Sequence, residues 1–264
     1  MFKETANIIT YNLIYDFENM KKSFIKARRR NCFIGADGED CKKIQNIDKY
    51  IENLIYILKE KRYVRKPMKY QKIISWDGLK THIVEMESFS DRVIEYAIQR
   101  CLETKFNSYR MPFVCNAGNK GERKYNIYIN KIKNKGCKYF VSYDVKKFTS
   151  SVDREILIKK MQQFCDKEFI EFVKYILFRK EEKGLPPGHI LTTYLANFYL
   201  YSVDIALNDY DVVRIGDNYL FGIKNLYEKE KIDIQLTDEL KKIKMTFNPD
   251  KITILLATDE VRKF

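Results

Sequence analysis

The sequence holds few residues of the kinds that build zinc sites. It has 2 histidines and 6 cysteines, and no two cysteines form a CxxC pair. A structural zinc site needs four closely spaced Cys or His ligands, so such a site is not expected. The scattered cysteines are predicted to be free thiols in a reducing compartment. They are Cys32, Cys41, Cys101, Cys115, Cys137 and Cys165.

Targeting and membrane signals are also missing. No signal peptide opens the sequence, and no apolar run is long enough to span a bilayer. A cytoplasmic protein that does not bind membranes is therefore expected. Internal repeats, low-complexity tracts and a clear linker are absent from the 264 residues, which suffice for one large domain or two small ones.

What the sequence has in excess is positive charge. It contains 49 Lys and Arg against 36 Asp and Glu, a formal charge of +13, with 45% hydrophobic residues. That hydrophobic content is typical of a folded protein. The charge favours a polyanionic partner, nucleic acid before membrane, although a generically basic surface is the alternative.

Hydrophobic periodicity predicts helices in residues 1–65. A basic run there is either a solvated helix end or a phosphate-binding arm. A strand pair around residues 76–78, a helix at 89–106 capped by Ser90 or Asp91, and a loop at 110–125 are expected next. The later elements expected are a strand at 138–148, helical residues 153–180, a helix at 189–207, the hairpin 212–222, a helix ending near Lys244, and a strand pair around 248–251.

Asp144 and Asp217 are carboxylates in unusual places. Asp144 follows an apolar strand, where aspartate is depleted, and Asp217 lies at the turn of the hairpin VVRIGDNYLFG, residues 212–222. On adjacent strands the two carboxylates would repel each other unless a cation lay between them, and Mg²⁺ suits such a site. The alternatives are an ordinary β-turn at Asp217 and an ion pair of Asp144 with Lys146 or Lys147.

Five motifs in this order resemble a bacterial reverse transcriptase, of the type that includes group II intron, diversity-generating and abortive-infection or other phage-defence enzymes. They are WDGLKTHIVEMESFSDRVIEYAIQRCLE, FVSYDVKKFTSSVD, GLPPGHILTTYLANFYL, VVRIGDNYLFG and MTFNPDKI. The resemblance covers roughly residues 65–255. It implies an α+β right-hand polymerase fold, fingers and palm with an antiparallel palm sheet, whose thumb is absent or truncated.

The resemblance also divides the chain into domains. Residues 1–65 are expected to be an N-terminal basic helical region, residues 66–135 the fingers, and residues 136–264 the palm, with a helical insertion at about 153–183.

Site residues follow from the same motifs. The resemblance implies that Asp144 and Asp217 hold Mg²⁺ or Mn²⁺ with the backbone carbonyl of Val145, and that Lys251 acts as general acid beside the leaving pyrophosphate. The nucleotide-binding residues that it implies are Lys80, Phe148, Thr149, Pro187 and Gly188. The nucleic-acid-binding residues predicted from the basic runs are Lys26, Arg28, Arg29, Arg30, Lys120 and Arg123.

The sequence departs from the family pattern at several of these positions. Asn218 stands where the family has a second aspartate, so one charge is lost beside Asp217 and weaker metal binding is expected. The other departures are Ile215 for a tyrosine, Thr81 for an arginine, Pro187 for a glutamine, and Phe148 and Thr149 at the positions that exclude a ribose hydroxyl.

The predicted function is that of an RNA-directed DNA polymerase that uses two-metal nucleotidyl transfer, in phage defence or a retroelement. The alternative is a weakened or inactive polymerase-like subunit that binds nucleic acid or a partner reverse transcriptase. Template-independent or protein-primed synthesis is a third reading. The expected partners are an RNA template or non-coding RNA, a DNA primer, dNTPs, and a second polymerase subunit or a chain that supplies the thumb.

Overall fold

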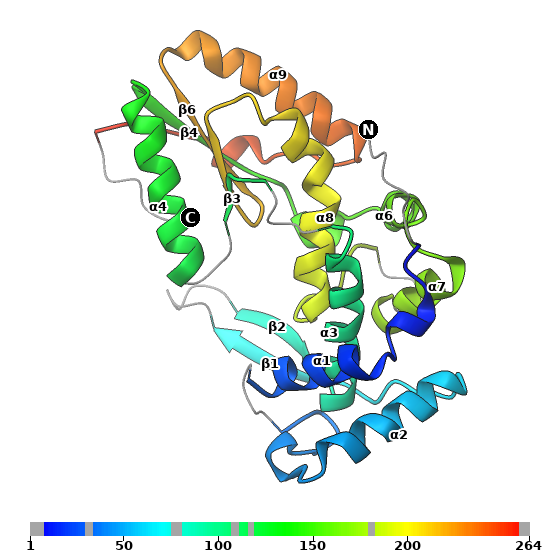
Figure 1. The fold of residues 1–264 in the computed structure, drawn as a ribbon. Coiled ribbons are helices and arrows are strands. Elements are labelled where there is room, and N and C mark those ends of the chain that lie inside the picture. The colour runs from blue at the N-terminus through cyan, green and yellow to red at the C-terminus, as the bar shows by residue number, and fades with distance from the viewer. Residues whose placement is uncertain are drawn as a thin grey trace. The chain divides into compact units, whose positions relative to one another are not determined.

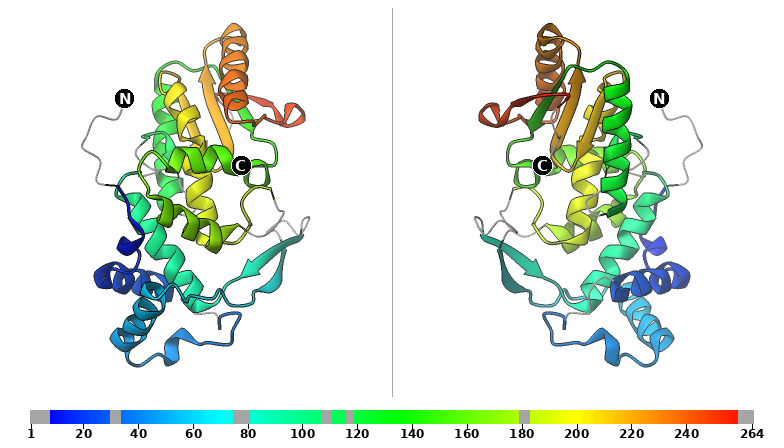
Figure 2. Two further views of the ribbon diagram at one scale, coloured as in Figure 1. Left: turned by 90° about the vertical axis from the view of Figure 1, so that its right-hand side faces the viewer. Right: turned by 90° about the vertical axis from the view of Figure 1, so that its left-hand side faces the viewer.

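The computed structural model describes residues 8–29, 34–74, 81–106, 111–115, 119–178 and 183–258. The chain forms two compact units, Met1–Asn107 with Arg154–Leu195, and Ser108–Asp153 with Ala196–Phe264. Figures 1 and 2 show their helices and strands. Within the described ranges, no helix combines the length and the apolar character needed to cross a membrane. The three-domain division predicted from the sequence stays a prediction.

The first unit is mostly helical. Helix α1 lies against α3, where the rings of Phe24 and Phe89 meet edge to face at 5.1 Å between centroids, and both residues are buried. Its elements are the 3-10 turns Tyr11–Leu13 and Cys41–Lys43, the helices α1 (Phe17–Arg29), α2 (Ile47–Lys59), α3 (Phe89–Glu103), α6 (Arg154–Met161) and α7 (Lys167–Leu177), and the antiparallel strands β1 (Lys69–Ile74) and β2 (Thr81–Met86).

Polar side chains define where these helices begin. The N-cap of α3 is Ser88, whose Oγ accepts a hydrogen bond from the Asp91 amide at 3.0 Å. The prediction of Ser90 or Asp91 as the cap is therefore wrong, because both lie inside the first turn and are buried. Asp166 caps α7 in the same way, accepting from the Phe169 amide at 2.7 Å.

The second unit is built on a five-stranded sheet with the order β3-β5-β6-β4-β7. Four strands pair in antiparallel fashion, as expected, and β3 adds one parallel pair with β5 at the edge. The strands are β3 (Val114–Cys115), β4 (Tyr139–Asp144), β5 (Val212–Ile215), β6 (Asn218–Ile223) and β7 (Thr253–Leu256). The other elements are α4 (Asn119–Asn134), α5 (Phe148–Ser151), α9 (Leu226–Lys242) and the 3-10 turn Pro249–Lys251. Helix α8 (Ile190–Ala206) begins in the first unit and ends in the second.

Helices cover both faces of this sheet. Successive side chains of β4 point to opposite faces, so the strand contacts a helix on each side. Phe140 points into the core that α4 completes, and Tyr143 points to α9, where its hydroxyl donates to Asp233 at 2.6 Å. Figure 1 shows both helices beside the strands. The core under α4 consists of Cys115, Tyr125, Ile129, Ile132, Phe140, Val213 and Leu220.

Two predicted segments differ from the structure. The expected loop 110–125 contains β3 and the first turns of α4, because Tyr125, Ile129 and Ile132 form a buried stripe that outweighs the helix-breaking tendency of Gly121. The expected strand pair around 248–251 is a 3-10 turn followed by the single strand β7, which pairs with β4.

Five cysteines are free thiols, as predicted, and Cys32 lies outside the described residues. Burial raises the pKa of Cys101 to about 12, so this thiol stays protonated at neutral pH.

Candidate active site

The hairpin of β5 and β6 holds Asp217 at its tip. Ile215 pairs with Asn218, so Gly216 and Asp217 alone form the connecting loop. Gly216 has φ of 59°, a backbone conformation that glycine adopts without strain and that a two-residue hairpin loop requires. The predicted tight turn is confirmed. Asn218 is the first residue of β6 and lies outside the loop.

The sheet brings Asp217 to Asp144. Strand β4 pairs with β6 so that Asp144 lies opposite Asn218, and the Val145 amide donates to the Asp217 carbonyl at 3.0 Å. Asp144 and Asp217, which the sequence predicted to be neighbours, are therefore neighbours in the structure.

Burial and charge both act on this pair. Burial raises the pKa of Asp217, and the negative charge of Asp144 raises it further, while Lys251 and Arg214 oppose the shift. Lys251 Nζ lies 2.9 Å from Asp144 Oδ1, so the ion pair of Asp144 is with Lys251 and not with Lys146 or Lys147. The lysine side chain is 54% exposed, which leaves its ammonium free to exchange this partner for a phosphate.

These groups fit a divalent cation. Two carboxylates lie close enough for one to raise the pKa of the other, and a cation between them would remove that repulsion. The backbone bridge of Val145 with Phe247 uses the Asp144 carbonyl and the Lys146 amide, and leaves the Val145 carbonyl outside this pair of hydrogen bonds. Asp144, Asp217 and the Val145 carbonyl thus offer the oxygen ligands that Mg²⁺ prefers.

The side chain of Asn218 lies beside the carboxylate of Asp217. Its Nδ2 lies 3.4 Å from Asp217 Oδ1, at the long end of the hydrogen-bond range. The side chain thus supplies a weak donor where a second aspartate would supply a negative charge.

We expect Asn218→Asp to lower the Mg²⁺ concentration that supports half-maximal primer extension, by about tenfold, because a third carboxylate joins the pair. A Mg²⁺ titration of extension measures this. The matched control is Asn208→Asp, at an exposed position with the same change of charge. An unchanged half-saturating concentration in an active enzyme would show that Asn218 does not limit metal binding.

The remaining predicted site residues fall in several places. Phe148 and Thr149 are half-buried in α5, just after Lys147, whose φ is 49°. Pro187 and Gly188 precede α8 in the first unit, and Gly188 has φ of 95°. Their contacts with a nucleotide stay predictions. Lys80 and Arg30, with the turn at 76–78, lie outside the described residues.

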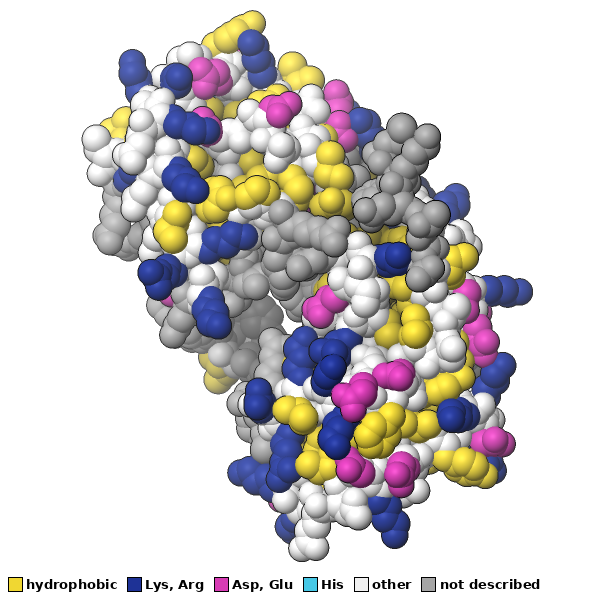
Figure 3. All heavy atoms as spheres, in the orientation of Figure 1, with side chains coloured by type: hydrophobic (Ala, Val, Ile, Leu, Met, Phe, Trp, Pro, Cys, Tyr) yellow, Lys and Arg dark blue, Asp and Glu magenta, His cyan; other side chains and the backbone are white. Residues whose placement is uncertain are grey.

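Three of the predicted nucleic-acid-binding residues lie along α1. Lys26 and Arg29 line a hollow of about 530 Å³ between α1 and α3, and Arg28 lies on the same helix. The other residues around the hollow are Lys22, Ile25, Tyr96, Gln99 and Arg100. No acidic residue lines it among the described residues. Lys120 and Arg123 are exposed on α4, and Lys and Arg side chains recur over the face shown in Figure 3.

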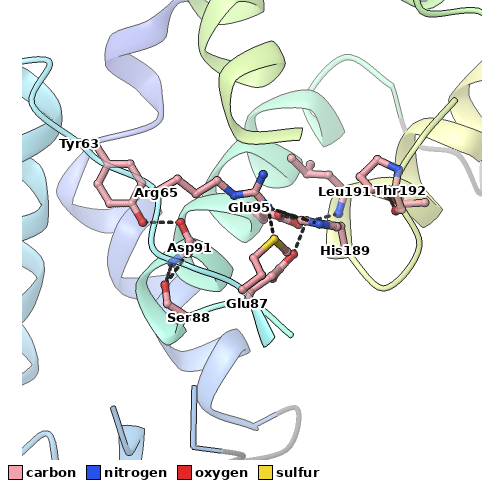
Figure 4. Close-up of polar contacts among 11 residues, drawn as sticks. Tyr63, Arg65, Glu87, Ser88, Asp91, Glu95, His189, Leu191 and Thr192 are labelled. Atoms are coloured by element: carbon pink, nitrogen blue, oxygen red, sulfur yellow. Dashed lines mark hydrogen bonds and ion pairs between the residues drawn. The ribbon is translucent and has the colours of Figure 1, made fainter. Parts of the chain in front are cut away.

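A second polar cluster was missed by sequence reasoning. Among the described residues, one group of three side chains has ligand atoms close enough to share a metal ion: Glu87, Glu95 and His189, all buried. Figure 4 shows the two glutamates and Arg65 converging on the His189 ring. Its only sequence signal is a glutamate inside an otherwise apolar helix face, between Ile94 and Tyr96.

The distances in this cluster are those of hydrogen bonds. His189 Nδ1 lies 2.5 Å from Glu87 Oε1 and 2.6 Å from Glu95 Oε1, whereas two ligands of one tetrahedral zinc ion lie about 3.3 Å apart. Arg65 Nη2 lies 3.3 Å from His189 Nε2 and supplies a further positive charge. We therefore interpret the cluster as a buried ion-pair network of the two glutamates and His189, with the Arg65 guanidinium beside the imidazole ring.

Protonation in this cluster differs from that of free side chains. Burial and the adjacent Glu95 raise the pKa of Glu87 to about 8. Burial lowers the pKa of His189, but hydrogen bonds to both glutamates outweigh it and raise the pKa to about 10. Glu95 has a lowered pKa, because its bond to His189 outweighs its burial. At neutral pH Glu87 therefore keeps its proton, whereas Glu95 is ionised.

These shifts predict a pH dependence of stability. A raised folded-state pKa contributes stability that is complete below the unfolded value and is lost as pH rises through the folded value. For Glu87 the loss falls between pH 4.5 and about 8, and for His189 between pH 6.5 and about 10. The melting temperature of the wild type should therefore fall from pH 6 to pH 10. In Glu87→Gln, whose side chain stays neutral at every pH, the decline in melting temperature should begin at a higher pH. Parallel curves for both proteins would contradict this assignment.

Comparison with known sequences decides the family. Residues 77–263 match the family described as reverse transcriptase (RNA-dependent DNA polymerase). The chain belongs to the reverse transcriptase family. This match confirms the family resemblance and the α+β polymerase fold predicted from the motifs, with the five-stranded sheet as the palm.

Two curated proteins and one solved structure are among those similar to the chain. The chain is 24% identical over 236 residues to the group II intron-encoded protein LtrA of Lactococcus lactis subsp. cremoris, a match that covers 81% of the chain and 37% of LtrA. It is 27% identical over 111 residues to a putative COX1/OXI3 intron 1 protein of Saccharomyces cerevisiae, covering 38% of the chain and 12% of that protein. A telomerase structure from Candida albicans matches 80% of the chain and 47% of its own, with 13% identity and a TM-score of 0.49.

Proposed function

We propose that this reverse transcriptase chain catalyses metal-dependent, RNA-directed DNA synthesis at Asp144 and Asp217. The observation that carries the proposal is the β4–β6 register, which puts Asp144 opposite Asn218 and joins Val145 to Asp217 by a backbone hydrogen bond. The repulsion between the two carboxylates, which raises the pKa of Asp217, would be relieved by a bound cation.

The roles of the residues follow from their places. Mg²⁺ held by Asp144, Asp217 and the Val145 carbonyl would make the attacking 3′-hydroxyl more acidic and offset charge on the leaving phosphate. We propose that Lys251 neutralises the pyrophosphate and donates a proton to it, a role supported by its ion pair with Asp144. Positioning and charge neutralisation carry the rate of phosphoryl transfer, so these few groups suffice.

The substrates that we propose are an RNA template, a DNA primer and dNTPs, with the protein acting in the cytoplasm in phage defence or a retroelement. Support comes from the excess of positive charge and from the family match. A non-coding RNA and a second polymerase chain are further candidate partners.

One experiment separates synthesis from scaffolding. The protein is incubated with primer, RNA template, four dNTPs and Mg²⁺ or Mn²⁺, with and without template. We expect template-dependent extension that Asp144→Ala abolishes. If no condition gives extension, the chain is a polymerase-like subunit, the alternative that Asn218 favours by removing a carboxylate next to Asp217. Extension that persists without template would indicate template-independent synthesis.

The basic hollow between α1 and α3 is proposed to bind the phosphate backbone of the RNA. Reversing two of its charges, in the double variant Lys22→Glu with Arg29→Glu, should weaken RNA binding about tenfold at 0.15 M salt. It should also reduce the slope of log affinity against log salt by about 1.4 to 1.8. Fluorescence anisotropy with labelled RNA measures both quantities.

The control for this charge reversal is Lys42→Glu with Lys49→Glu, two exposed lysines outside the hollow. If both double variants lose the same affinity, RNA binding depends on net charge and the hollow has no particular role.

A further inference from the structure

Arg214 is an arginine in the interior of an active-site strand. It lies on β5, two residues before Gly216, and its side chain is 0% exposed. A buried charge is retained only where paired and hydrogen-bonded groups surround it. The partners of Arg214 therefore show what the side chain does.

The guanidinium is held on two sides. Nε and Nη2 bind the two oxygens of Asp204 at 2.8 and 2.6 Å, a bidentate pair with a fixed plane. Nη1 donates to Asn197 Oδ1 at 2.8 Å. Tyr219 donates its hydroxyl to Asp204 at 2.8 Å, so the carboxylate is fixed as well. Asp204 and Asn197 come from α8, which makes the helix the fixed support for the arginine.

The same guanidinium reaches the loop that carries Asp217. Nη1 also donates to the carbonyl of Gly216 at 2.6 Å. This carbonyl belongs to the peptide that links Gly216 to Asp217, so the hydrogen bond fixes the plane of that peptide. Among the described residues, no atom lies within 4 Å of where a Cβ at Gly216 would be, so none of their side chains packs against this position. The bond from Arg214 supplies the restraint that packing does not.

We propose that Arg214 is a positioning residue for the catalytic centre, which fixes the peptide before Asp217 so that this carboxylate faces Asp144. The inference rests on the proposed function, since it assigns Asp217 to metal binding. Asn197 and Asp204 act through Arg214 and hold its guanidinium in the plane that the Gly216 carbonyl needs.

Arg214→Lys tests the proposal, because lysine keeps the charge but cannot bind Asp204 in bidentate fashion and reach Gly216 together. We expect kcat for primer extension to fall 10- to 100-fold and the half-saturating Mg²⁺ concentration to rise at least tenfold. KM for dNTP should change less than threefold. The control is Arg62→Lys, which makes the same substitution at an exposed arginine outside this network. Its kcat should stay within threefold of the wild type.

A purely structural role gives a different result. If Arg214→Lys lowers the melting temperature but its folded fraction keeps the kcat and Mg²⁺ dependence of the wild type, the proposal is overturned. If Arg214→Lys does not fold, Asn197→Ala replaces it, since this variant keeps the Asp204 ion pair. It should raise the half-saturating Mg²⁺ concentration three- to tenfold, and no change would overturn the proposal.

Failure of the proposed function is recognised separately. If the wild type extends no primer, Mn²⁺ binding measured by calorimetry becomes the readout. Wild-type binding that weakens at least tenfold in Arg214→Lys supports the positioning role in a protein without polymerase activity. Equal binding by both proteins, or by neither, overturns it.

Discussion

Asp217→Asn should abolish primer extension while raising the melting temperature. The loss of activity should be about 10³-fold or more, because several kcal/mol of charge stabilisation disappear with the bound metal. The gain in stability follows from the raised pKa of Asp217. Such a group stabilises the fold only at low pH, and its ionised form costs free energy at pH 7, so a neutral amide of the same shape removes that cost.

Opposite effects on activity and stability are the signature of a site kept for function. The control is Asp209→Asn, at an exposed aspartate with the same change of charge. This control should leave both extension and melting temperature near those of the wild type. If Asp217→Asn retains more than a tenth of wild-type extension, Asp217 does not hold the metal.

Glu95→Ala should give the largest loss of stability. It leaves His189 as a buried positive charge without its main counter-ion, and breaking a buried pair costs about 3–5 kcal/mol. It also leaves the Leu191 amide, which donates to Glu95 Oε2 at 3.2 Å, without its acceptor at the start of α8. For a chain of this size the melting temperature should fall by roughly 6 to 20 °C.

The comparison for this stability loss is Glu52→Ala on α2, an exposed glutamate whose removal should change the melting temperature by about 1–2 °C at most. Thermal unfolding followed by circular dichroism measures both variants. A change of less than 1 kcal/mol in Glu95→Ala would show that the cluster carries little net stability and that its charges are compensated in another way.

The sequence allowed the carboxylate pair to be predicted because two independent local patterns converge there. Asp144 ends an apolar strand and Asp217 sits in a short hairpin turn, and the order of motifs required the two strands to be neighbours. The sheet register then supplied the contact. A role for Lys251 was implied only by the family resemblance of MTFNPDKI, and the structure pairs its ammonium with Asp144.

The two buried networks show why the rest was not predicted. Glu95 and His189 are 94 residues apart, and their meeting depends on how α3 packs beside the turn before α8. No local pattern in the sequence singles out Arg214, and only the folded structure pairs it with Asp204 and Gly216. The start of α4 was missed because Pro112, Gly118 and Gly121 suggest a loop, while the buried residues that decide the helix lie further along it.

The position of a bound metal ion tests the central claim most directly. Crystals grown with Mn²⁺, primer–template and a non-hydrolysable dNTP would be measured at the manganese absorption edge. We predict an anomalous peak at the carboxylates of Asp144 and Asp217, which is lost in Asp217→Asn. Mn²⁺ bound at Glu87, Glu95 and His189, with none at the two aspartates, would contradict the account.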